Sequence, residues 1–526
     1  MPDASCAAAV VLAAGQGTRM RSVTPKVLHR LAGRSMLHHA LVAASAIGAA
    51  RVCVVVRHDR DRVAAHVREV APGTVVADQD EVPGTGRAFA CALAALDAAG
   101  GTGGGAGGAP PGGRVVVTYG DVPLLRPATL AALLAADPGA AVTVLTAVVD
   151  DPAGYGRVVR DPAGEVTGIV EHRDADQATR RLREVNSGVY ALDLAFVRDA
   201  VARLRPSNAQ GELYLTDVVA LARADGRRVA AVVADDPREL EGVNDRAQLA
   251  AARRRLNDRL LADLMTAGVD VEDPATTWVD AGVAVAPDAV IRPGSHLEGA
   301  TVVESGAVVG PATTLADARV RAGARVLRSH VLGADVGPGA TVGPFAYLRP
   351  GTVLGAGAKV GAYVETKNAV LGDGAKVPHL SYVGDITVGR GANIGAGTIV
   401  ANYDGVAKHA TAVGEEARVG SNTVLVAPVA IGAGAYTAAG SVVDADVPAG
   451  ALAVARGRLH VSEGWVARRR PGTPADEAAR SAAADPPEPG PQGQNGADRA
   501  PHGSTDRPAA SGTTRHRDDS IEGEGA

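Results

Sequence analysis

Cysteine and aromatic residues are scarce in this sequence. Three of the 526 residues are cysteines (Cys6, Cys53 and Cys91), and their spacing matches neither a metal site nor a disulfide framework. This pattern is typical of reduced thiols, so we expect a cytoplasmic protein. Aromatic residues make up 3% of the chain, and the net charge is -5. With few stacking platforms and no excess of positive charge, we expect no nucleic-acid partner and no anionic membrane partner.

Long apolar runs are also missing. No stretch reaches the roughly 18 apolar residues that a membrane-spanning helix needs. The first apolar run, residues 7–14, lacks a preceding basic segment and leads into a glycine-rich loop, so it is interpreted as a strand and not as a signal peptide.

Lysine is rare too, because most of the basic residues of the chain are arginines. A retained lysine can therefore mark a position that needs a compact ammonium group. The lysines are Lys26, Lys359, Lys367, Lys376 and Lys408.

The N-terminal half alternates short apolar runs with helical stretches. Residues 7–14, 52–56 and 115–118 predict buried strands, and the segments between them are rich in alanine and leucine. Strands that alternate with helices indicate a parallel sheet in a Rossmann-like α/β domain, here residues 1–244. Residues 100–113 consist mostly of glycine, alanine and proline, which predicts a flexible surface insertion.

The C-terminal half has a different period. Apolar residues recur at every sixth position, for example Val285, Ile291, Leu297, Val303 and Val309. Further along the chain, a glycine often follows the apolar residue directly. A period of six fits neither an α-helix nor a flat strand. It is typical of a β-helix of hexapeptide repeats, in which six residues form one side of a triangular coil. Such prisms resemble the left-handed kind, so we predict a left-handed parallel β-helix over residues 269–469.

Three further segments complete the predicted organisation. Residues 245–268 are arginine-rich with a helical pattern and predict a linker helix. The six-residue phase is interrupted at residues 365–381, which predicts a long functional loop. Residues 470–526 are rich in Pro, Gly, Ala, Asp and Ser and predict a disordered tail.

One loop in the N-terminal half has the composition of a phosphate site. The run GQGTRM at residues 15–20 follows the first strand, and its glycines let backbone N–H groups approach a phosphate. Lys26 adds one of the rare lysines. Asp121 follows the strand at 115–118, at the end of a parallel strand where α/β sheets bind ligands, and its carboxylate suits Mg²⁺. The alternatives are a plain tight turn and a helix cap.

Sequence motifs relate the chain to a known family. LAAGQGTRM, PKVL, GTG and YGDVPL resemble the sugar-nucleotide pyrophosphorylases. Further motifs are similar to one branch of the pyrophosphorylases. In the N-terminal half they are GYGRVV, IVEH, EVNSGVY and EGVND, and in the C-terminal half they are GPFAYLRPG, VETKN, HLSYVGD, NIGAGTIVANYDG and VGSNTVLVAPV. That branch comprises the bifunctional N-acetylglucosamine-1-phosphate uridylyltransferase/glucosamine-1-phosphate acetyltransferases. The resemblance covers roughly residues 7–465.

The resemblance implies a uridylyltransferase site in the N-terminal half. The sugar 1-phosphate would attack the α-phosphorus of UTP with Mg²⁺ bound, and pyrophosphate would leave. Arg19 and Lys26 are the expected catalytic residues because they neutralise phosphate charge. Asp121 and Asn244 are the expected Mg²⁺ ligands. The expected substrate-binding residues are Leu12, Ala13, Ala14, Gly15, Lys26, Gln79, Gly84, Thr85, Tyr119, Gly120, Asp121, Gly156, Glu171, Asn186 and Asn244. Among these, Gly156, Glu171 and Asn186 are expected to contact the sugar.

The resemblance implies a second site, for acetyl transfer, in the β-helix. His379 is the expected base, since a neutral imidazole can take a proton from an amine as it attacks a thioester. The alternative for His379 is a simple hydrogen-bond partner in a loop. The residues expected to bind glucosamine-1-phosphate are Arg349, Lys367, Tyr382 and Asn393. Those expected along acetyl-CoA are Ala396, Asn402, Tyr403, Ser421, Ala439 and Arg456.

Two positions depart from the family pattern. Family members usually carry a basic residue where Gln16 stands and a histidine where Arg87 stands. Gln16 keeps polarity but not charge, which removes one contact expected for pyrophosphate.

Three functions remain open from the sequence. The first is the bifunctional enzyme of UDP-N-acetylglucosamine and cell-wall synthesis; the second is a nucleotidyltransferase with a non-catalytic, oligomerising β-helix; the third is a scaffold. The combination of Lys367, His379 and Tyr382 favours the first, because a structural β-helix does not need it. The family's prisms form homotrimers, so we expect a homotrimer in which Arg456 of a neighbouring chain approaches His379.

Overall fold

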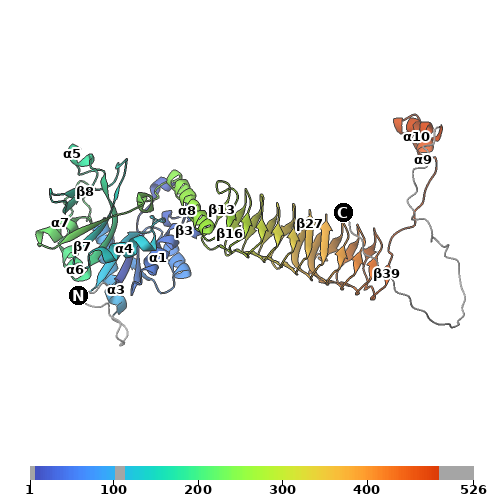
Figure 1. Cartoon of the computed structure of the whole chain (residues 1–526), viewed down its shortest axis with the longest axis horizontal. Helices are drawn as coiled ribbons and strands as arrows, with labels where there is room; N and C mark the ends of the chain where they lie inside the picture. The colour runs from blue at the N-terminus through green and yellow to red at the C-terminus, as the bar shows by residue number, and fades with distance from the viewer. Residues whose placement is uncertain (1–5, 101–112, 485–526) are drawn as a thin grey trace. The chain divides into compact units, whose positions relative to one another are not determined.

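The computed structural model describes residues 6–100 and 113–484 (Figure 1). Residues up to Arg456 form one compact unit, and those from Gly457 form a second. Most of the predicted glycine-rich insertion and the tail beyond residue 484 lie outside the described residues. Within the described ranges, no helix is both long and apolar enough to cross a membrane.

A nine-stranded sheet forms the centre of the N-terminal part (Figure 1). Its strand order is β11-β7-β10-β6-β1-β4-β5; off this path, β8 pairs with β10, and β9 pairs with β8. The bounds are β1 (Cys6–Leu12), β4 (Val52–Val56), β5 (Val75–Asp78), β6 (Arg114–Tyr119), β7 (Val142–Val148), β8 (Arg157–Arg160), β9 (Val166–Val170), β10 (Glu184–Asp193) and β11 (Val229–Val233). The three predicted strands correspond to β1, β4 and β6, which are parallel. Strand β10 runs antiparallel to β6 and β7, because the chain enters it from the β8–β9 hairpin and not through a crossover helix.

Helices cover both faces of this sheet. They are α1 (Met36–Ala46), α2 (Arg60–Val70), α3 (Thr85–Gly100), α4 (Pro127–Ala136), α5 (Gln177–Arg180), α6 (Leu194–Arg203) and α7 (Asp217–Ala224), with 3-10 turns η1 (Thr18–Met20), η2 (Lys26–Leu28) and η3 (Pro237–Leu240). Successive side chains of β1 point to opposite faces. Val11 packs in the cluster that contains Leu41, and Val10 packs in the cluster that contains Phe89. All seven residues of β1 are therefore buried.

Helix α8 (Arg246–Thr266) leads from the sheet to the β-helix and closes its first coil. Asn257 is 1% exposed; its Nδ2 donates to the Thr277 carbonyl at 2.8 Å, and its Oδ1 accepts from the Val279 N–H at 2.9 Å. The amide thereby serves backbone groups that a preceding coil would otherwise serve. Leu261 of the same helix is buried in the core of the β-helix.

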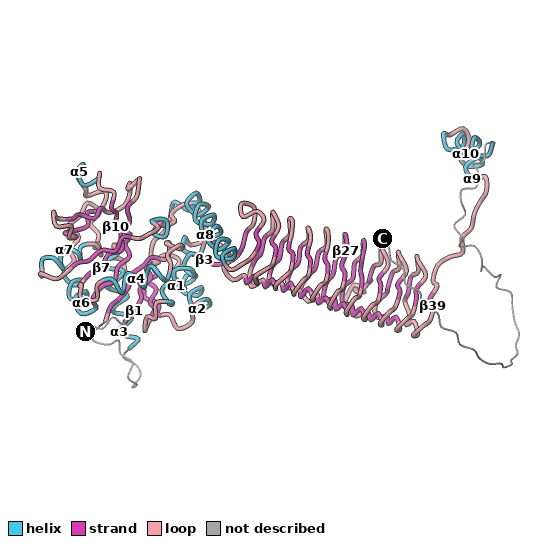
Figure 2. The backbone as a smooth tube through the Cα atoms, in the orientation of Figure 1, coloured by secondary structure: helices cyan, strands magenta, loops and turns pink. Residues whose placement is uncertain are grey.

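The β-helix runs from β12 (Asp270–Val271) to β39 (Leu452–Ala453) as stacked parallel strands (Figure 2). It contains an 11-stranded and a 17-stranded sheet around one continuous apolar core. The six-residue period therefore predicted the architecture correctly. The strands near the candidate site are β25 (Tyr347–Leu348), β27 (Lys359–Ala362), β28 (Glu365–Leu371), β29 (Lys376–His379), β30 (Tyr382–Val388), β31 (Asn393–Ile394), β32 (Ile399–Ala401), β33 (Thr411–Val413), β34 (Arg418–Val419) and β37 (Tyr436–Thr437).

The prediction of a long loop at residues 365–381 is wrong, because this segment continues the coils of the β-helix as strands β28 and β29. Thr366 is fully buried at an inward position, which a search for apolar residues misses. The next inward residue, Leu371, comes after five residues instead of six, and this shorter side shifts the phase without breaking the coil.

The excursion from the coils lies instead at residues 402–410, between β32 and β33. An antiparallel bridge joins Tyr403 to Lys408, and the His409 N–H donates to the Asn402 carbonyl at 2.8 Å. These bonds fold residues 402–409 into a short hairpin.

The second unit contains α9 (Trp465–Arg469) and α10 (Pro474–Ala484). The expectation of disorder from residue 470 differs from the structure over α10. Its sequence lacks large apolar residues, but alanine is a strong helix former. Asp476 accepts hydrogen bonds from Arg480 one turn later and from the Gly472 N–H, which supports the first turn.

Candidate functional site

A cavity of about 350 Å³ opens where β1, β4, β5 and β6 end. Because parallel strands end at the same edge, residues far apart in the sequence meet there. The predicted residues among its lining are Leu12, Ala13, Ala14, Gly15, Lys26, Gln79, Gly84, Thr85, Tyr119 and Asp121. Gly120 lies between the last two in the chain.

One wall of this cavity is held by close backbone contacts. Gly84 has φ +116, and a Cβ there would lie 2.2 Å from the Leu213 carbonyl oxygen, so only glycine fits. The Gln79 amide donates to the Val82 carbonyl at 3.0 Å and to the Gly84 carbonyl at 3.3 Å. Its Oε1 is thereby directed away from these carbonyls and can accept a hydrogen bond from a ligand.

Three predicted polar residues converge at the other end of the cavity. The Lys26 Nζ donates to the Asp121 carboxylate and to Asn244 Oδ1, the latter at 2.9 Å. The Val243 N–H donates to the Asp121 backbone carbonyl at 2.9 Å, which ties the segment carrying Asn244 to the end of β6. Gly17 packs against Lys26 so closely that a Cβ there would lie 2.5 Å from the lysine Cβ.

This arrangement fits a divalent cation. Asp121 and Asn244 direct hard oxygen atoms at one cationic group, the Lys26 ammonium. No cluster of three or more His, Cys, Asp or Glu side chains suited to a metal occurs in residues 6–100 and 113–484. Two protein oxygens nevertheless suffice where phosphate oxygens and water complete the shell, as Mg²⁺ commonly requires.

The remaining polar and charged residues near the cavity divide into two groups. Gln16, Arg57, His58 and Glu212 line it, and the sequence motifs selected none of the last three. Arg57 and His58 could have been found because they follow the strand at 52–56, whose end meets the same edge. Arg19 is exposed on η1 and is not part of the lining, and Arg87 pairs with Asp80.

The three predicted sugar contacts lie together. The Asn186 N–H donates to the Gly156 carbonyl at 2.9 Å, and a Cβ on Gly156 would lie 3.1 Å from Glu171 Oε1. The Tyr190 hydroxyl donates to Asn186 Oδ1 at 3.0 Å. Burial, with the nearby charges of Asp174 and Asp217, raises the pKa of Glu171.

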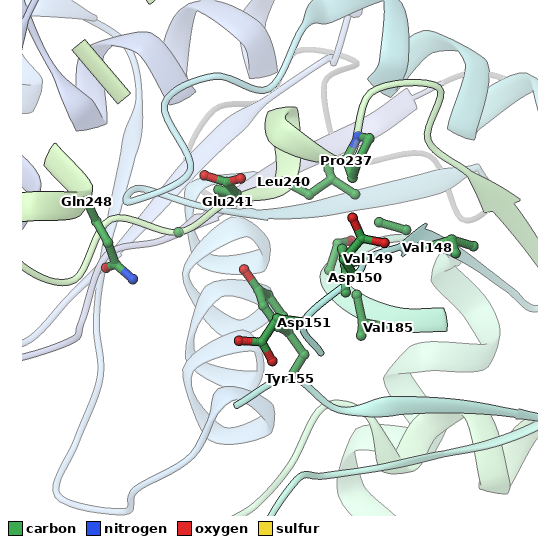
Figure 3. Close-up of a pocket in the computed structure, with 13 residues that line it drawn as sticks. Val148, Val149, Asp150, Asp151, Tyr155, Val185, Pro237, Leu240, Glu241 and Gln248 are labelled. Carbon is green, nitrogen blue, oxygen red and sulfur yellow. The ribbon is translucent and has the colours of Figure 1, made fainter. Parts of the chain in front are cut away.

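A separate cavity of about 390 Å³ lies beside the end of β7 (Figure 3). Val185 of β10 lines it, whereas the next residue, Asn186, belongs to the sugar contacts. Its charged lining residues include Asp150, which pairs with Arg183, and Glu241, which pairs with Arg255. This cavity contains none of the predicted site residues.

In the β-helix, five predicted residues form a column along one edge. Strand register places His379, Ala396, Ser421 and Ala439 in successive coils, and Arg456 donates to the Ala439 carbonyl at 3.0 Å. The backbone bonds Gly397 N–H to His379 O, Asn422 N–H to Ala396 O and Gly440 N–H to Ser421 O confirm this order.

The column fixes the place of Arg456 within one chain. Four coil steps separate it from His379, or about 19 Å at ~4.8 Å per step. An extended carrier such as acetyl-CoA can lie along such an edge with its two ends far apart. The expectation that Arg456 of a neighbouring chain approaches His379 stays a prediction.

A polar surface lies across the corner from His379. Strands β25, β28 and β30 align Tyr347 with Glu365 and then with Tyr382, so Arg349, Lys367 and Tyr382 share one face of the prism. The Arg349 guanidinium donates to Glu365 at 2.9 Å, which raises the pKa of Arg349. Asn393 follows in β31, one coil beyond Lys376.

The hairpin at residues 402–409 brings a further cation to this surface. The nearby Lys367 ammonium group lowers the pKa of Lys408. Motif comparison had not selected Lys408, although the rarity of lysine was a usable signal. Tyr403, predicted beside the thioester, is 58% exposed on the hairpin, and its hydroxyl donates to the Gly405 carbonyl at 2.7 Å.

Known proteins resemble this chain along most of its length. The family described as MobA-like NTP transferase domain matches residues 9–185. The bifunctional protein GlmU of Thermobifida fusca is 54% identical over 480 residues, which cover 91% of this chain and 98% of that protein. Proteins of the same name from Streptomyces coelicolor (54% over 479 residues, 90% and 97%) and Corynebacterium aurimucosum (50% over 488 residues, 92% and 98%) are similar to it as well.

Proposed function

The chain belongs to the family of bifunctional GlmU proteins, and from this premise we propose which residues perform each of its two reactions. The protein is a bifunctional transferase that N-acetylates glucosamine-1-phosphate with acetyl-CoA and transfers a uridylyl group from UTP to N-acetylglucosamine-1-phosphate. We assign uridylyl transfer to the cavity at the end of β1 and acetyl transfer to the edge of the β-helix that carries His379.

In the uridylyltransferase site, UTP lies along residues 12–15, with its uracil against Gln79 and Gly84. The sugar 1-phosphate lies toward Asn186, and one of its phosphate oxygens attacks the α-phosphorus while pyrophosphate leaves. Lys26 faces the reacting phosphates and neutralises their growing charge. The remaining proposed contacts are Thr85, Tyr119, Gly120, Gly156 and Glu171.

The family generally uses a divalent metal, and we propose Mg²⁺ held by Asp121 and Asn244. When bound, Mg²⁺ supplies charge neutralisation and orients phosphate oxygens. Arg19 is exposed on the glycine-rich loop, and we assign it to the leaving pyrophosphate. Gln16 in the same loop brings no charge to that end of the nucleotide.

In the acetyltransferase site, acetyl-CoA lies along the column of Ala396, Ser421, Ala439 and Arg456. The phosphate of glucosamine-1-phosphate binds Arg349 and Lys367, with Tyr382 and Asn393 beside them. The amine nitrogen attacks the thioester carbonyl carbon, a C–N bond forms, and the C–S bond breaks to release CoA. His379 takes the proton that the amine loses, with Asn402 and Tyr403 beside the thioester.

One observation carries this proposal: the column along the prism edge and the cationic surface around Lys367 meet at His379. A β-helix that only stabilised or oligomerised the protein would not need both. The alternative of a nucleotidyltransferase with a non-catalytic β-helix leaves this arrangement unexplained.

We further propose a homotrimer. Phe345, Tyr363 and Leu380 occupy one corner in successive coils, all at positive φ, and they are 51%, 61% and 61% exposed. The rings of Phe345 and Tyr363 stack with centroids 5.3 Å apart. Large apolar residues are costly both at left-handed φ and against water, so another surface is expected to cover them. Neighbouring copies in a closed three-fold arrangement would do so next to His379.

We propose a cytoplasmic location. Cys6 and Cys53 are buried thiols, and burial raises their pKa to about 11 and about 12, so both are unreactive. Unpaired thiols of this kind are typical of a reducing compartment.

The assignment is tested with variants in one coupled assay. Asp121→Ala should abolish pyrophosphate release from UTP and leave CoA release intact, and His379→Ala should do the reverse. Asp97→Ala and His330→Ala serve as matched controls and should change neither. Loss of both activities in folded Asp121→Ala would contradict two separate sites.

A further inference from the structure

Asp385 lies on β30 beside the proposed acetyl site, and both oxygens of its carboxylate accept hydrogen bonds from side-chain amides. Asn368 Nδ2 donates to Oδ1 at 3.0 Å, and Asn402 Nδ2 donates to Oδ2 at 2.6 Å. The three residues occupy the same corner of successive coils. Asp385 thus links the strand that carries Lys367 to the hairpin that carries Lys408.

The contact with Asp385 orients the Asn402 amide. Asn402 is 7% exposed, and its Nδ2 lies 2.6 Å from Asp385 and 3.5 Å from the Tyr382 hydroxyl. A carboxylate can only accept hydrogen bonds, so it selects the NH₂ end of the amide. The carbonyl Oδ1 of Asn402 then faces away from Asp385 and can accept a hydrogen bond from an amine.

Asp385 also faces the two neighbouring lysines. Burial alone would raise its pKa, but the hydrogen bonds from Asn368 and Asn402 and the charges of Lys367 and Lys408 hold the pKa below its usual value. The other carboxylates of this region have different partners: Glu365 pairs with Arg349, and Asp404 pairs with His409.

We propose that Asp385 is a positioning residue for acetyl transfer. It directs the Asn402 carbonyl oxygen toward the amine of the amino sugar and keeps Lys367 and Lys408 together as two ammonium groups for the sugar phosphate. This inference rests on the proposed acetyl site and adds a residue that touches neither substrate.

A purely structural role is the alternative, because Asp and Asn tolerate the left-handed φ of such corners. Asp317 provides the matched case. It lies on the same corner four coils earlier, has φ 49 where Asp385 has φ 52, and accepts a hydrogen bond from the Ala300 N–H at 2.9 Å. At ~4.8 Å per coil it is about 19 Å from Asp385.

The test compares Asp385→Asn with Asp317→Asn in the full-length chain, with the uridylyltransferase rate as the reference for folded enzyme. In Asp385→Asn, kcat/KM for glucosamine-1-phosphate should fall about 10- to 100-fold, as expected for misplaced catalytic groups. KM for acetyl-CoA should stay unchanged. Asp317→Asn should match the wild type in every constant.

The pH profile separates charge from shape. Lys408 is faced by Lys367 from β28 and by Asp385 and Tyr382 from β30. Without the carboxylate it loses its proton more readily, so the alkaline limb of kcat/KM should move to lower pH in Asp385→Asn. Asp385→Glu keeps the charge and should retain the wild-type limb while kcat falls.

Three results would overturn the inference: wild-type constants in Asp385→Asn, an equal loss in Asp317→Asn, or an unmoved alkaline limb. Lys367→Met checks the underlying site. If it raises KM for the amino sugar while Asp385→Asn leaves kcat/KM for the amino sugar unchanged, only the role of Asp385 is wrong. If Lys367→Met has no effect on acetyl transfer, the site assignment fails, and the inference fails with it.

Discussion

Replacing Asn257 by alanine should destabilise the junction between α8 and the β-helix without changing either active site. The side chain is almost fully buried and serves the Thr277 carbonyl and the Val279 N–H at the first coil. Alanine would leave both backbone groups without this partner.

The magnitude follows from these two contacts. An unsatisfied buried donor or acceptor costs about 1–3 kcal/mol. Two such groups, with partial relief from water, should cost about 3 kcal/mol. At an m-value of about 2 kcal/mol/M, the urea midpoint of this region should fall by about 1.5 M.

Fluorescence of Trp278 is a suitable assay, because this residue lies between the two affected positions with the Arg254 guanidinium 4.2 Å from its ring centroid. The chain has two tryptophans, so a Trp465→Phe background leaves Trp278 as the single reporter. Asp263→Ala, an exposed change on the same helix, is the control and should shift the midpoint little. A shift in Asn257→Ala no larger than in Asp263→Ala would refute the reasoning.

Three further predictions concern pH, assembly and the C-terminal segment. Burial lowers the pKa of His39 from 6.5 to about 4, so folding favours its neutral form. The contribution of neutral His39 to the free energy of unfolding is fully present above pH 6.5. It is lost as pH falls toward 4, by up to about 3 kcal/mol. His39→Gln should show a smaller drop in urea midpoint between pH 7.5 and 4.5, and an unchanged drop would contradict this. Leu380→Asp should dissociate the trimer in sedimentation and lose acetyl transfer, with exposed Met265→Asp as the control; a monomeric, fully active wild type would exclude the trimer. Deleting residues 471–526 should leave both activities and Tm nearly unchanged because both sites lie in the first compact unit, and a large fall in Tm would show that the segment stabilises it.

Local pattern was sufficient for the main architecture. Spacing of apolar residues predicted both the strands at 7–14, 52–56 and 115–118 and the coils of the β-helix, because periodicity directly reflects which side chains face a core. It failed at residues 365–381, where buried Thr366 and a five-residue side kept the coil intact. Apolarity alone cannot recognise a threonine that occupies an inward position.

The candidate sites were predictable to the extent that motifs marked them. Motifs selected His379 and Lys367, but the long loop predicted around them is not present, because Lys367 lies on strand β28 and His379 ends strand β29. Lys408 and Asp385 had no motif-based role. Their importance arises from contacts between a hairpin and two strands, which no short segment records.

The sequence by itself determined the two-part organisation, the β-helix and the family, because these depend on residue type and spacing along the chain. Only the tertiary structure decided that Lys26 joins Asp121 to Asn244, that His379 and Arg456 share one edge, and that Asp385 faces two lysines. These relations depend on strand register and on where loops return. Both are fixed by packing and hydrogen bonding between segments that are distant in the chain.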